Sequence, residues 1–408
     1  MPEFTTGWMI LVNDQIPMTN DQRRRILIFS TAYYPFVGGA EVAVKEITDR
    51  LVGSFDFDLI TARFEKKLPP VEKVGNVTVY RIGSGKPKLD KIFLPFRGAV
   101  LASKLNKTHN YFCFWGIMAT FASGAGYIYN IFRTLNGKKK IPMVLTLQEG
   151  DSENHLQYKW LGLISLSWKL ALRQTDLLTG ISNFLLHRAE KNGYKGKSFL
   201  IPNGVDFSLF SKEISDQDKL SLKNRLGKKE EDIFLVTVGR LVHKNGVDDI
   251  ISATALLPEN ISLLVIGKGD LGHNLQKQAD SLGLGNRVKF LGFVPYSELP
   301  KYLSVCDIFV RPSRSEGFGN SFIEAMAAKI PVIATPVGGI VDFIDDRGTG
   351  LFCSPDNPQS IVSAIKAILE GNSLRDSMVQ NAYNRVKGSY TWDNIAPEMK
   401  QVFNQIEQ

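Results

Sequence analysis

Short apolar runs alternate with amphipathic stretches along most of this chain. A first series opens with RILIFST near residue 25, a helix-like segment over about 40–52 and DLIT, and continues through VTVY, YFCFW, PMVLTL, DLLTGIS and SFLIP. Buried apolar runs of this length, separated by helix-like segments, are typical of βαβ units with a parallel sheet. The pattern predicts a doubly wound α/β domain over residues 22–205.

A second series of the same kind follows the turn-rich IPNGVDFSLF and a polar stretch over 211–232. Its strand-like runs are IFLVTVGR, ISLLVIG, RVKFLG, CDIFVRPS, PVIATP and GLFCS. At 408 residues the chain exceeds one ordinary hydrophobic core. We therefore expect a disordered tail over 1–21, a second Rossmann-like domain over 206–386, and a C-terminal helix within 387–408 that returns to the first domain. In such sheets ligands bind beyond the carboxyl ends of the strands, so the site is expected between the domains.

The positive charge is concentrated in the first domain. Residues 22–205 carry 27 Lys and Arg against 13 Asp and Glu, whereas the whole chain has a net charge of +8. Such an excess attracts anionic lipid, a phosphorylated acceptor or nucleic acid, although a merely solvated lysine-rich face has the same composition. No zinc-finger spacing or RNA-binding signature is present, so nucleic acid is not an expected partner.

Cysteine usage and hydropathy indicate in which cellular compartment the protein is expected. Cys113, Cys306 and Cys353 are far apart and form no C-x-x-C motif, which favours a reducing cytoplasm. The longest apolar candidate, residues 111–132, is interrupted by Gly, Ser and Thr, so no membrane span is expected. The prediction is a cytoplasmic protein whose basic first domain, with its apolar region over 92–132, touches the anionic inner face of the cell membrane.

The most informative segment is SEGFGNSFIEAMA, residues 315–327. Gly317 and Gly319 allow a close backbone approach to a ligand, and Asn320 or Ser321 can cap the helix that follows. Free amides at a helix N-terminus bind phosphate. The flanking carboxylates, Glu316 and Glu324, suit sugar and ribose hydroxyls. An alternative stays open, because Ser321-x-x-Glu324 is also a good capping box.

This segment resembles the E-x7-E signature of the retaining glycosyltransferases of family four, which have the GT-B architecture. Similar segments follow the family's order along the chain: YYPFVGGAE, IPNGVDFSLF, VGRLVHKNGVDDIISA and, after the signature, TPVGGIVDFI. The resemblance implies two Rossmann-like doubly wound domains facing each other across a cleft. It further implies transfer of a hexose, with retention and without a metal, from a UDP- or GDP-linked sugar to a hydroxyl of a glycan or lipid-linked saccharide.

Residue roles follow from the resemblance. In the family an Arg and a Lys contact the donor diphosphate; Arg240 matches, but Asn245 stands at the lysine position, and we expect the adjacent Lys244 to serve. Glu316 would take the sugar hydroxyls and Glu324 the ribose. The remaining donor-binding positions are the amides of Gly317, Phe318, Gly319 and Asn320, together with Gly38, Gly39, Asn203, Gly267, Phe293 and Val294.

On the acceptor side the chain departs from the family. The segment TLQEGDSE, residues 146–153, has Gln148 where many relatives have histidine. Glu149 and Asp151 are candidates for binding the acceptor hydroxyl, or else ordinary loop carboxylates. No metal or cofactor is expected, because the five histidines are dispersed and the D-x-D letters of residues 56–58 suit a solvated turn.

Two other kinds of function remain open. One is a sugar-nucleotide epimerase or phosphorylase on a similar two-lobed fold, and the other is a non-catalytic nucleotide-sugar-binding protein. Arg240, Glu316 and Glu324 favour the transferase, while Gln148 and Asn245 favour the binding protein.

Overall fold

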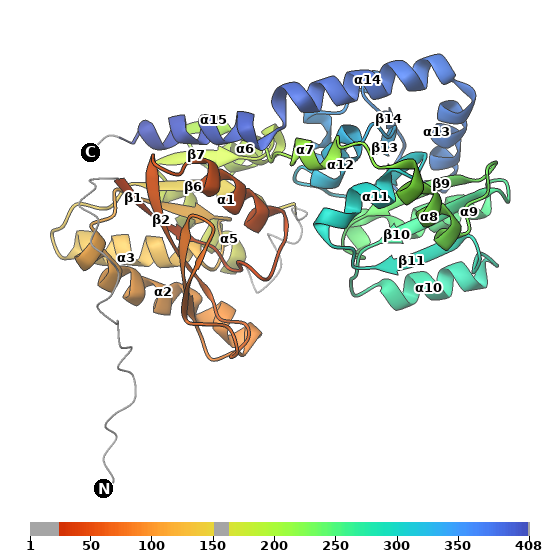
Figure 1. The fold of residues 1–408 in the computed structure, drawn as a ribbon. Helices are drawn as coiled ribbons and strands as arrows, with labels where there is room; N and C mark the ends of the chain where they lie inside the picture. The colour runs from red at the N-terminus through yellow and green to blue at the C-terminus, as the bar shows by residue number, and fades with distance from the viewer. Residues whose placement is uncertain (1–23, 151–162, 407–408) are drawn as a thin grey trace, which may run out of the picture.

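The computed structural model describes residues 24–150 and 163–406, with the side chains of residues 163–166 excepted. The predicted tail, residues 1–21, lies outside them. Two α/β lobes stand side by side, joined near α7 and again between the long helices α14 and α15 (Figure 1). Each lobe is built on its own sheet.

The first lobe contains an eight-stranded sheet of order β3-β4-β2-β1-β5-β6-β7-β8. Its pairs are parallel except for the hairpin of β3 and β4. The strands are β1 (Arg24–Phe29), β2 (Phe55–Ala62), β3 (Val71–Val74), β4 (Val77–Ile82), β5 (Cys113–Ile117), β6 (Met143–Leu147), β7 (Leu177–Gly180) and β8 (Lys197–Leu200). The helices are α1 (Gly39–Arg50), α2 (Pro87–His109), α3 (Ser123–Leu135), α5 (Leu163–Gln174) and α6 (Asn183–Lys191). Every strand except β3 lies on a run that the hydrophobic pattern predicts.

The second lobe contains a six-stranded, parallel sheet of order β11-β10-β9-β12-β13-β14. Its strands are β9 (Ile233–Val238), β10 (Ile261–Ile266), β11 (Val288–Gly292), β12 (Ile308–Arg311), β13 (Val332–Ala334) and β14 (Leu351–Phe352). Its helices are α7 (Phe207–Phe210), α8 (Asp216–Leu226), η1 (His243–Asn245), α9 (Val247–Ala255), α10 (Gly272–Ser281), η2 (Tyr296–Glu298), α11 (Leu299–Leu303), α12 (Asn320–Ala327), η3 (Gly338–Asp342), α13 (Pro358–Glu370) and α14 (Asn372–Ser389).

The order of strands in the second sheet reverses direction at one place. β10 and β11 extend from one side of β9, and β12, β13 and β14 extend from the other. The loops after β9 and β12 therefore diverge and open a crevice at their carboxyl ends, where open α/β sheets bind ligands. The prediction of two lobes, each with a doubly wound and largely parallel sheet, is confirmed.

Helix α15 (Trp392–Asn404) leaves the second lobe and packs on the first. Phe403 lies edge-on to Trp115 of β5, with ring centroids 5.2 Å apart, and to Phe55 of β2 at 5.4 Å. The buried core on this face of the first sheet includes six residues of α15. A β-bridge pairs Val205 with Thr391, so the two crossings of the chain run alongside each other.

Asp56 and Asp58 correct one expectation. They lie within β2 rather than in a solvated turn. Asp58 is buried, accepts a hydrogen bond from Tyr111 at 2.6 Å and lies 3.6 Å from Arg25, which also pairs with Asp56. These carboxylates connect β2 to Arg25 of β1, and Asp58 also connects it to Tyr111 just before β5. Burial raises the pKa of Asp58.

None of the helices in the described parts of the chain is both long enough and apolar enough to cross a membrane.

Candidate active site

The Gly-rich loop after β12 turns directly into α12. Gly319 is the N-cap residue, at φ 99°, and its conformation is one that side chains with a Cβ rarely adopt. No side chain caps the helix, and Ser321 lies inside it, where its hydroxyl accepts from Arg311 at 2.8 Å. The expected caps, Asn320 and Ser321, and the capping-box interpretation of Glu324 are therefore wrong. The first amides of α12 have no partners within the helix.

A second glycine-containing loop, with Gly338 and Gly339, packs against the Gly-rich loop. A Cβ on Gly338 would lie 1.8 Å from the carbonyl oxygen of Glu316, and one on Gly339 would lie 2.1 Å from that of Gly317. The amide of Gly339 donates to the Glu316 carbonyl at 3.2 Å. Backbone packed on backbone fixes the path of the Gly-rich loop. The carboxylate of Glu316 is thereby held at the base of the crevice.

The two carboxylates of the signature have different surroundings. Glu316 is buried; its Oε1 accepts from the Gly317 amide at 3.0 Å, and its Oε2 accepts from Arg311. Glu324 is partly exposed and has no hydrogen bond or ion pair with the described residues. Burial raises the pKa of Glu324 to about 7, against the opposing charge of Arg311. Glu324 therefore has a free carboxylate that a ligand hydroxyl would satisfy.

Three cations border the crevice. Arg240, directly after β9, is exposed and unpaired among residues 24–150 and 163–406. Burial raises the pKa of Glu41 at the start of α1, and the charge of Arg240 opposes that rise, so Arg240 faces the first lobe. Arg311 is buried. Lys244 donates from Nζ to the carbonyl of Gly150 at 3.2 Å.

The lobes touch at Gly150. Its carbonyl also accepts from the Ser315 hydroxyl at 3.0 Å. A Cβ on Gly150 would lie 2.6 Å from the amide nitrogen of Gly317. Only glycine permits this approach, so the loop after β6 meets the Gly-rich loop across the cleft.

A polar chain joins the lobes beside α12. Asn203 is buried and donates to Asn320 at 3.0 Å and to Gln148 at 3.5 Å. A Cβ on Gly39 would lie 3.2 Å from the Asn320 side chain. The predicted positions Gly39, Asn203, Gln148 and Asn320 therefore gather at one point, with Gly38 next to it as the N-cap of α1.

Glu149 requires a correction on the acceptor side. Its side chain is buried and accepts from the backbone amides of Ala119 and of Gln148. Burial raises its pKa. Glu149 fixes the loop after β6 to the loop after β5 and does not present its carboxylate to the cleft. Asp151 lies outside the described residues.

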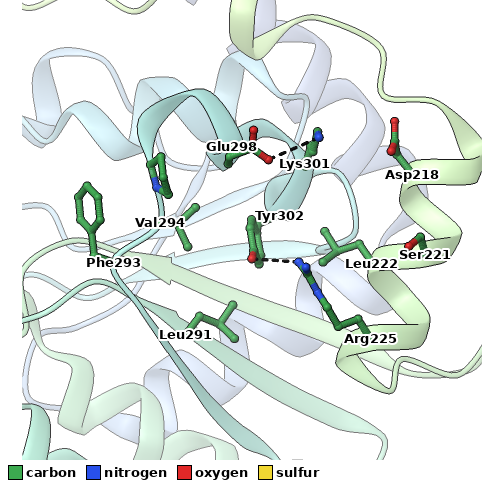
Figure 2. Close-up of a pocket in the computed structure, with 11 residues that line it drawn as sticks. Asp218, Ser221, Leu222, Arg225, Leu291, Phe293, Val294, Glu298, Lys301 and Tyr302 are labelled. Atoms are coloured by element: carbon green, nitrogen blue, oxygen red, sulfur yellow. Dashed lines mark hydrogen bonds and ion pairs between the residues drawn. The ribbon is translucent and has the colours of Figure 1, made fainter.

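The remaining predicted donor positions lie along the carboxyl edge of the sheet. A Cβ on Gly267 would lie 1.9 Å from the Gly239 carbonyl, so this glycine permits close packing of two strand ends. Phe318 is a core residue that offers only its backbone. Phe293 and Val294 follow β11 and border a hollow of about 270 Å³, whose lining also contains the hydrogen bond from Arg225 to Tyr302 (Figure 2). Phe293 is 70% exposed, which suits a planar ligand.

Two arginines of the site escaped the sequence analysis. One is Arg311, which binds Glu316 and Ser321. The other, Arg314, binds Asp248 through both carboxylate oxygens at 2.8 and 2.9 Å, and also Asp249 at 2.8 Å. The Arg314 guanidinium holds the pKa of Asp248 below its usual range, against the effect of burial. An arginine that ends the apolar strand IFVR was the available signal for Arg311. Nothing in the sequence paired Arg314 with Asp248 and Asp249, which lie 66 and 65 positions earlier.

Among the described residues, no three or more His, Cys, Asp or Glu side chains lie together in a way that could hold a metal ion.

Comparisons with known proteins agree with this architecture. Residues 37–209 match the model described as Glycosyltransferase Family 4, and residues 218–385 match Glycosyl transferases group 1. Sucrose-phosphate synthase from Thermosynechococcus elongatus superimposes with a TM-score of 0.79 at 22% identity, covering 94% of this chain and 99% of that one. Anabaena HepE in complex with UDP-glucose has a TM-score of 0.75 at 21% identity, covering 94% and 100%.

Among curated proteins, an uncharacterized glycosyltransferase of Methanocaldococcus jannaschii, MJ1607, is 33% identical over 214 residues. The match covers 52% of this chain and spans 55% of that relative. Two facing Rossmann-like lobes with the crevice described above define the GT-B class of glycosyltransferases. The chain belongs to glycosyltransferase family four.

Proposed function

We propose that this protein transfers a hexose from a UDP- or GDP-linked sugar to a hydroxyl of a glycan or lipid-linked saccharide, with retention at the anomeric carbon and without a metal ion. The observation that carries the proposal is a set of unpaired groups on the loops and helix that flank the crevice: the first amides of α12, Arg240 after β9, and the carboxylate of Glu324 one turn into α12. Amides and a cation suit a diphosphate, and a free carboxylate suits ribose hydroxyls.

The proposed division of labour follows from these surroundings. The α12 amides and Arg240 hold the diphosphate, while Glu316, fixed by Arg311, orients the sugar hydroxyls. As the bond between the anomeric carbon and the diphosphate oxygen breaks, negative charge grows on the leaving oxygen, and fixed positive groups stabilise it. The acceptor oxygen bonds to the anomeric carbon on the same face, and its proton passes to the leaving diphosphate. The UDP-glucose complex of HepE supports a nucleotide-sugar donor.

The contact between Lys244 and the loop after β6 fits a transferase that reacts while its two lobes are closed on each other. Lys244 and Ser315 both donate hydrogen bonds to the Gly150 carbonyl across the cleft. These bonds connect the acceptor-side loop to the donor-side loop. Closure of this kind excludes water, which would otherwise compete with the acceptor hydroxyl. We assign Lys244 to this contact.

A donor panel tests the proposal. UDP- and GDP-linked hexoses are incubated with the protein and with lipid-linked and free saccharide acceptors, in the presence of EDTA, and products are followed by mass spectrometry and NMR. We expect one nucleoside diphosphate released per glycosidic bond, with the donor's anomeric configuration kept. Arg240→Ala should lower kcat on the order of 100-fold, while Arg375→Ala, at a partly exposed arginine of α14, serves as the matched control.

The outcomes separate the alternatives. Isomerised donor without an acceptor would indicate an epimerase, and a requirement for inorganic phosphate would indicate a phosphorylase. Tight donor binding with no turnover on any acceptor would indicate a binding protein. Loss of activity in EDTA that Mg²⁺ restores would overturn the metal-free mechanism, and inversion in the product would overturn retention.

We also propose that the first lobe rests on an anionic membrane through α2 and the end of α3. These two helices pack together at the edge of the lobe (Figure 1). Large apolar side chains are exposed along one face of α2 at helical spacing and on α3: Leu89, Ile92, Phe93, Phe96, Val100, Phe132 and Leu135. Five lysines and arginines lie on α2, and its one carboxylate, Asp90, is buried. Exposed apolar groups on a helix that also carries several cations suit a surface with anionic headgroups.

Liposome cosedimentation tests this contact. The protein should bind vesicles of phosphatidylcholine with 30% phosphatidylglycerol, and a rise from about 0.1 to 0.5 M salt should weaken binding several-fold. Replacing Phe93 and Phe96 by serine should weaken it further, whereas Leu220→Ser, at an equally exposed leucine of α8, should not. Equal binding to pure phosphatidylcholine at all salt concentrations would refute the electrostatic contact.

A further inference from the structure

Arg311 occupies the centre of the crevice between β9 and β12. It is the last residue of β12 and is only 8% exposed. Nη1 donates to the Ser321 hydroxyl at 2.8 Å, while Nη2 donates to Asn245 Oδ1 at 2.9 Å and to the Glu316 carboxylate. One guanidinium thus joins the loop after β9, the Gly-rich loop and the first turn of α12. These are the three segments that form the donor end of the proposed site.

The side chain also has an unmatched donor. Arg311 Nε is inaccessible and has no hydrogen-bond acceptor among the described residues. A buried cation with an unused N–H costs stability, since burial favours neutral groups with all donors satisfied. An apolar residue would serve the end of a buried strand better. The bonds to Ser321, Asn245 and Glu316 offset part of this cost, and the unused Nε–H is the part that folding alone does not explain.

Asn245 joins the guanidinium of Arg311 to the backbone of Arg240. Its Oδ1 accepts from Arg311, and its Nδ2 donates to the carbonyl of Arg240 at 2.6 Å. Asn245 is buried, and a Cβ on Gly239 would lie 3.3 Å from its Nδ2 and 3.6 Å from the Arg311 guanidinium carbon. The pair therefore sits directly against the end of β9, where the crevice opens.

Position 245 is also where the donor motif resembled in the sequence has a lysine. A lysine there would extend its ammonium toward the guanidinium of Arg311, and two adjacent buried cations repel each other. This place accommodates one buried positive charge. The side chain that carries it can come from the loop after β9 or from the end of β12. In this chain it enters from β12, and position 245 is neutral.

Two nearby cations, Lys244 and Arg314, have protein partners of their own. Lys244 holds the Gly150 carbonyl across the cleft, and Arg314 is held by Asp248, Asp249 and Asp356. Lys244 is therefore not needed as a substitute for the family lysine.

We propose that Arg311 is the second fixed positive charge of the donor site, supplied from β12 in place of a lysine at position 245, and that Asn245 positions it. The inference rests on the proposed nucleotide-sugar site. Arg311 acts as a positioning residue: it orients Glu316 and adds positive potential where the diphosphate binds, without itself being freely exposed.

A charge-relocation experiment tests the pair. Arg311→Met, Asn245→Lys and the double variant are compared with wild type by calorimetric titration with UDP, GDP and uridine, and by thermal unfolding without ligand. Arg311→Met should weaken binding of the preferred nucleoside diphosphate by about 10- to 100-fold, on the scale of one lost charged donor, and leave uridine binding within about 3-fold. Asn245→Lys should also weaken it. The double variant should bind within about 5-fold of wild type, so the two changes should be strongly non-additive.

Two results would overturn the proposal: equal UDP or GDP affinity in wild type and Arg311→Met, or a double variant no better than the worse single variant. If Arg311→Met does not fold, Arg311→Lys carries the test, because it keeps the charge; retained preference for the diphosphate over uridine supports the proposal, and its loss refutes it. Wild type that binds neither UDP nor GDP would instead refute the proposed function, so the two failures are distinct.

Discussion

Glu324 makes the donor site sensitive to pH near neutrality. Its carboxylate is partly buried, has no protein partner among the described residues, and has a pKa of about 7. If ribose hydroxyls donate to this group, the ligand binds the ionised form. We therefore expect Glu324→Gln to abolish one component of the pH dependence of nucleotide binding and to leave the rest.

The magnitude follows from the titration. With a pKa of about 7, the carboxylate is ionised in about one molecule in eleven at pH 6 and about ten in eleven at pH 8. A ligand that requires the ionised form is weakened by the fraction that is competent. Wild type should then bind about 10-fold more tightly at pH 8 than at pH 6, beyond any change that the ligand's own phosphate causes.

Folding stability should respond in the opposite sense. Because the folded pKa of Glu324 lies above its ordinary value of 4.5, the stability that its neutral form contributes is present below pH 4.5. That stability is lost as the pH rises through about 7. The ceiling is about 3 kcal/mol, and remaining solvent contact reduces it to about 1–2 kcal/mol. Unliganded Glu324→Gln should therefore gain stability over wild type as the pH is raised from 5 to 8.

The assay is titration calorimetry with UDP and GDP at pH 6, 7 and 8, paired with thermal unfolding of the unliganded proteins. The ligand and its phosphates are the same in the titrations of wild type and of Glu324→Gln. The ratio of the two affinities therefore isolates the contribution of the Glu324 carboxylate. A ratio that does not change between pH 6 and pH 8 would refute the reasoning. So would a variant whose melting temperature relative to wild type is the same at both pH values.

Two further predictions concern the lobes. Gly150→Ala places a Cβ 2.6 Å from the Gly317 amide, so closure should be obstructed and kcat/KM should fall about 10- to 100-fold with little change in melting temperature. Gly388→Ala, where nothing lies within 4 Å of the added Cβ, should leave the kinetics unchanged. Equal kinetics for the two variants would contradict the closure contact. Arg314→Ala removes the partner of Asp248, Asp249 and Asp356 and should lower the free energy of unfolding by about 3 kcal/mol, measured by urea denaturation. Arg375→Ala, at a partly exposed arginine with one carboxylate partner, should change it by under about 1 kcal/mol. Similar losses for the two arginines would show that the Arg314 cluster contributes little.

The sequence predicted the fold well because each buried parallel strand is a continuous apolar run. RILIFST, IFLVTVGR and CDIFVRPS each contain a strand of the structure. Strand β3 was missed since VEKV alternates half-buried and exposed residues at the edge of the sheet and lacks such a run.

The site was predicted less completely, because local spacing cannot distinguish a residue's direction. Gly319 rather than Ser321 caps α12, since the positive φ of the turn selects glycine there. Glu149 was expected in the cleft, but its carboxylate turns inward to backbone amides of another loop. The guanidinium of Arg311 meets Asn245, 66 positions earlier, only after β9 and β12 pair in the sheet.

The return of α15 to the first lobe also affects how the protein is made. Trp392 and Phe403 complete the core around Trp115, although about 190 residues separate α15 from the end of β8. At about 5–20 residues per second on the ribosome, that interval lasts about 10–40 s. During this time the nascent first lobe has an uncovered apolar face beside α1, while the second lobe is still being synthesised. The first lobe therefore begins folding first but finishes last, and the apolar face in between is the surface on which a chaperone would act.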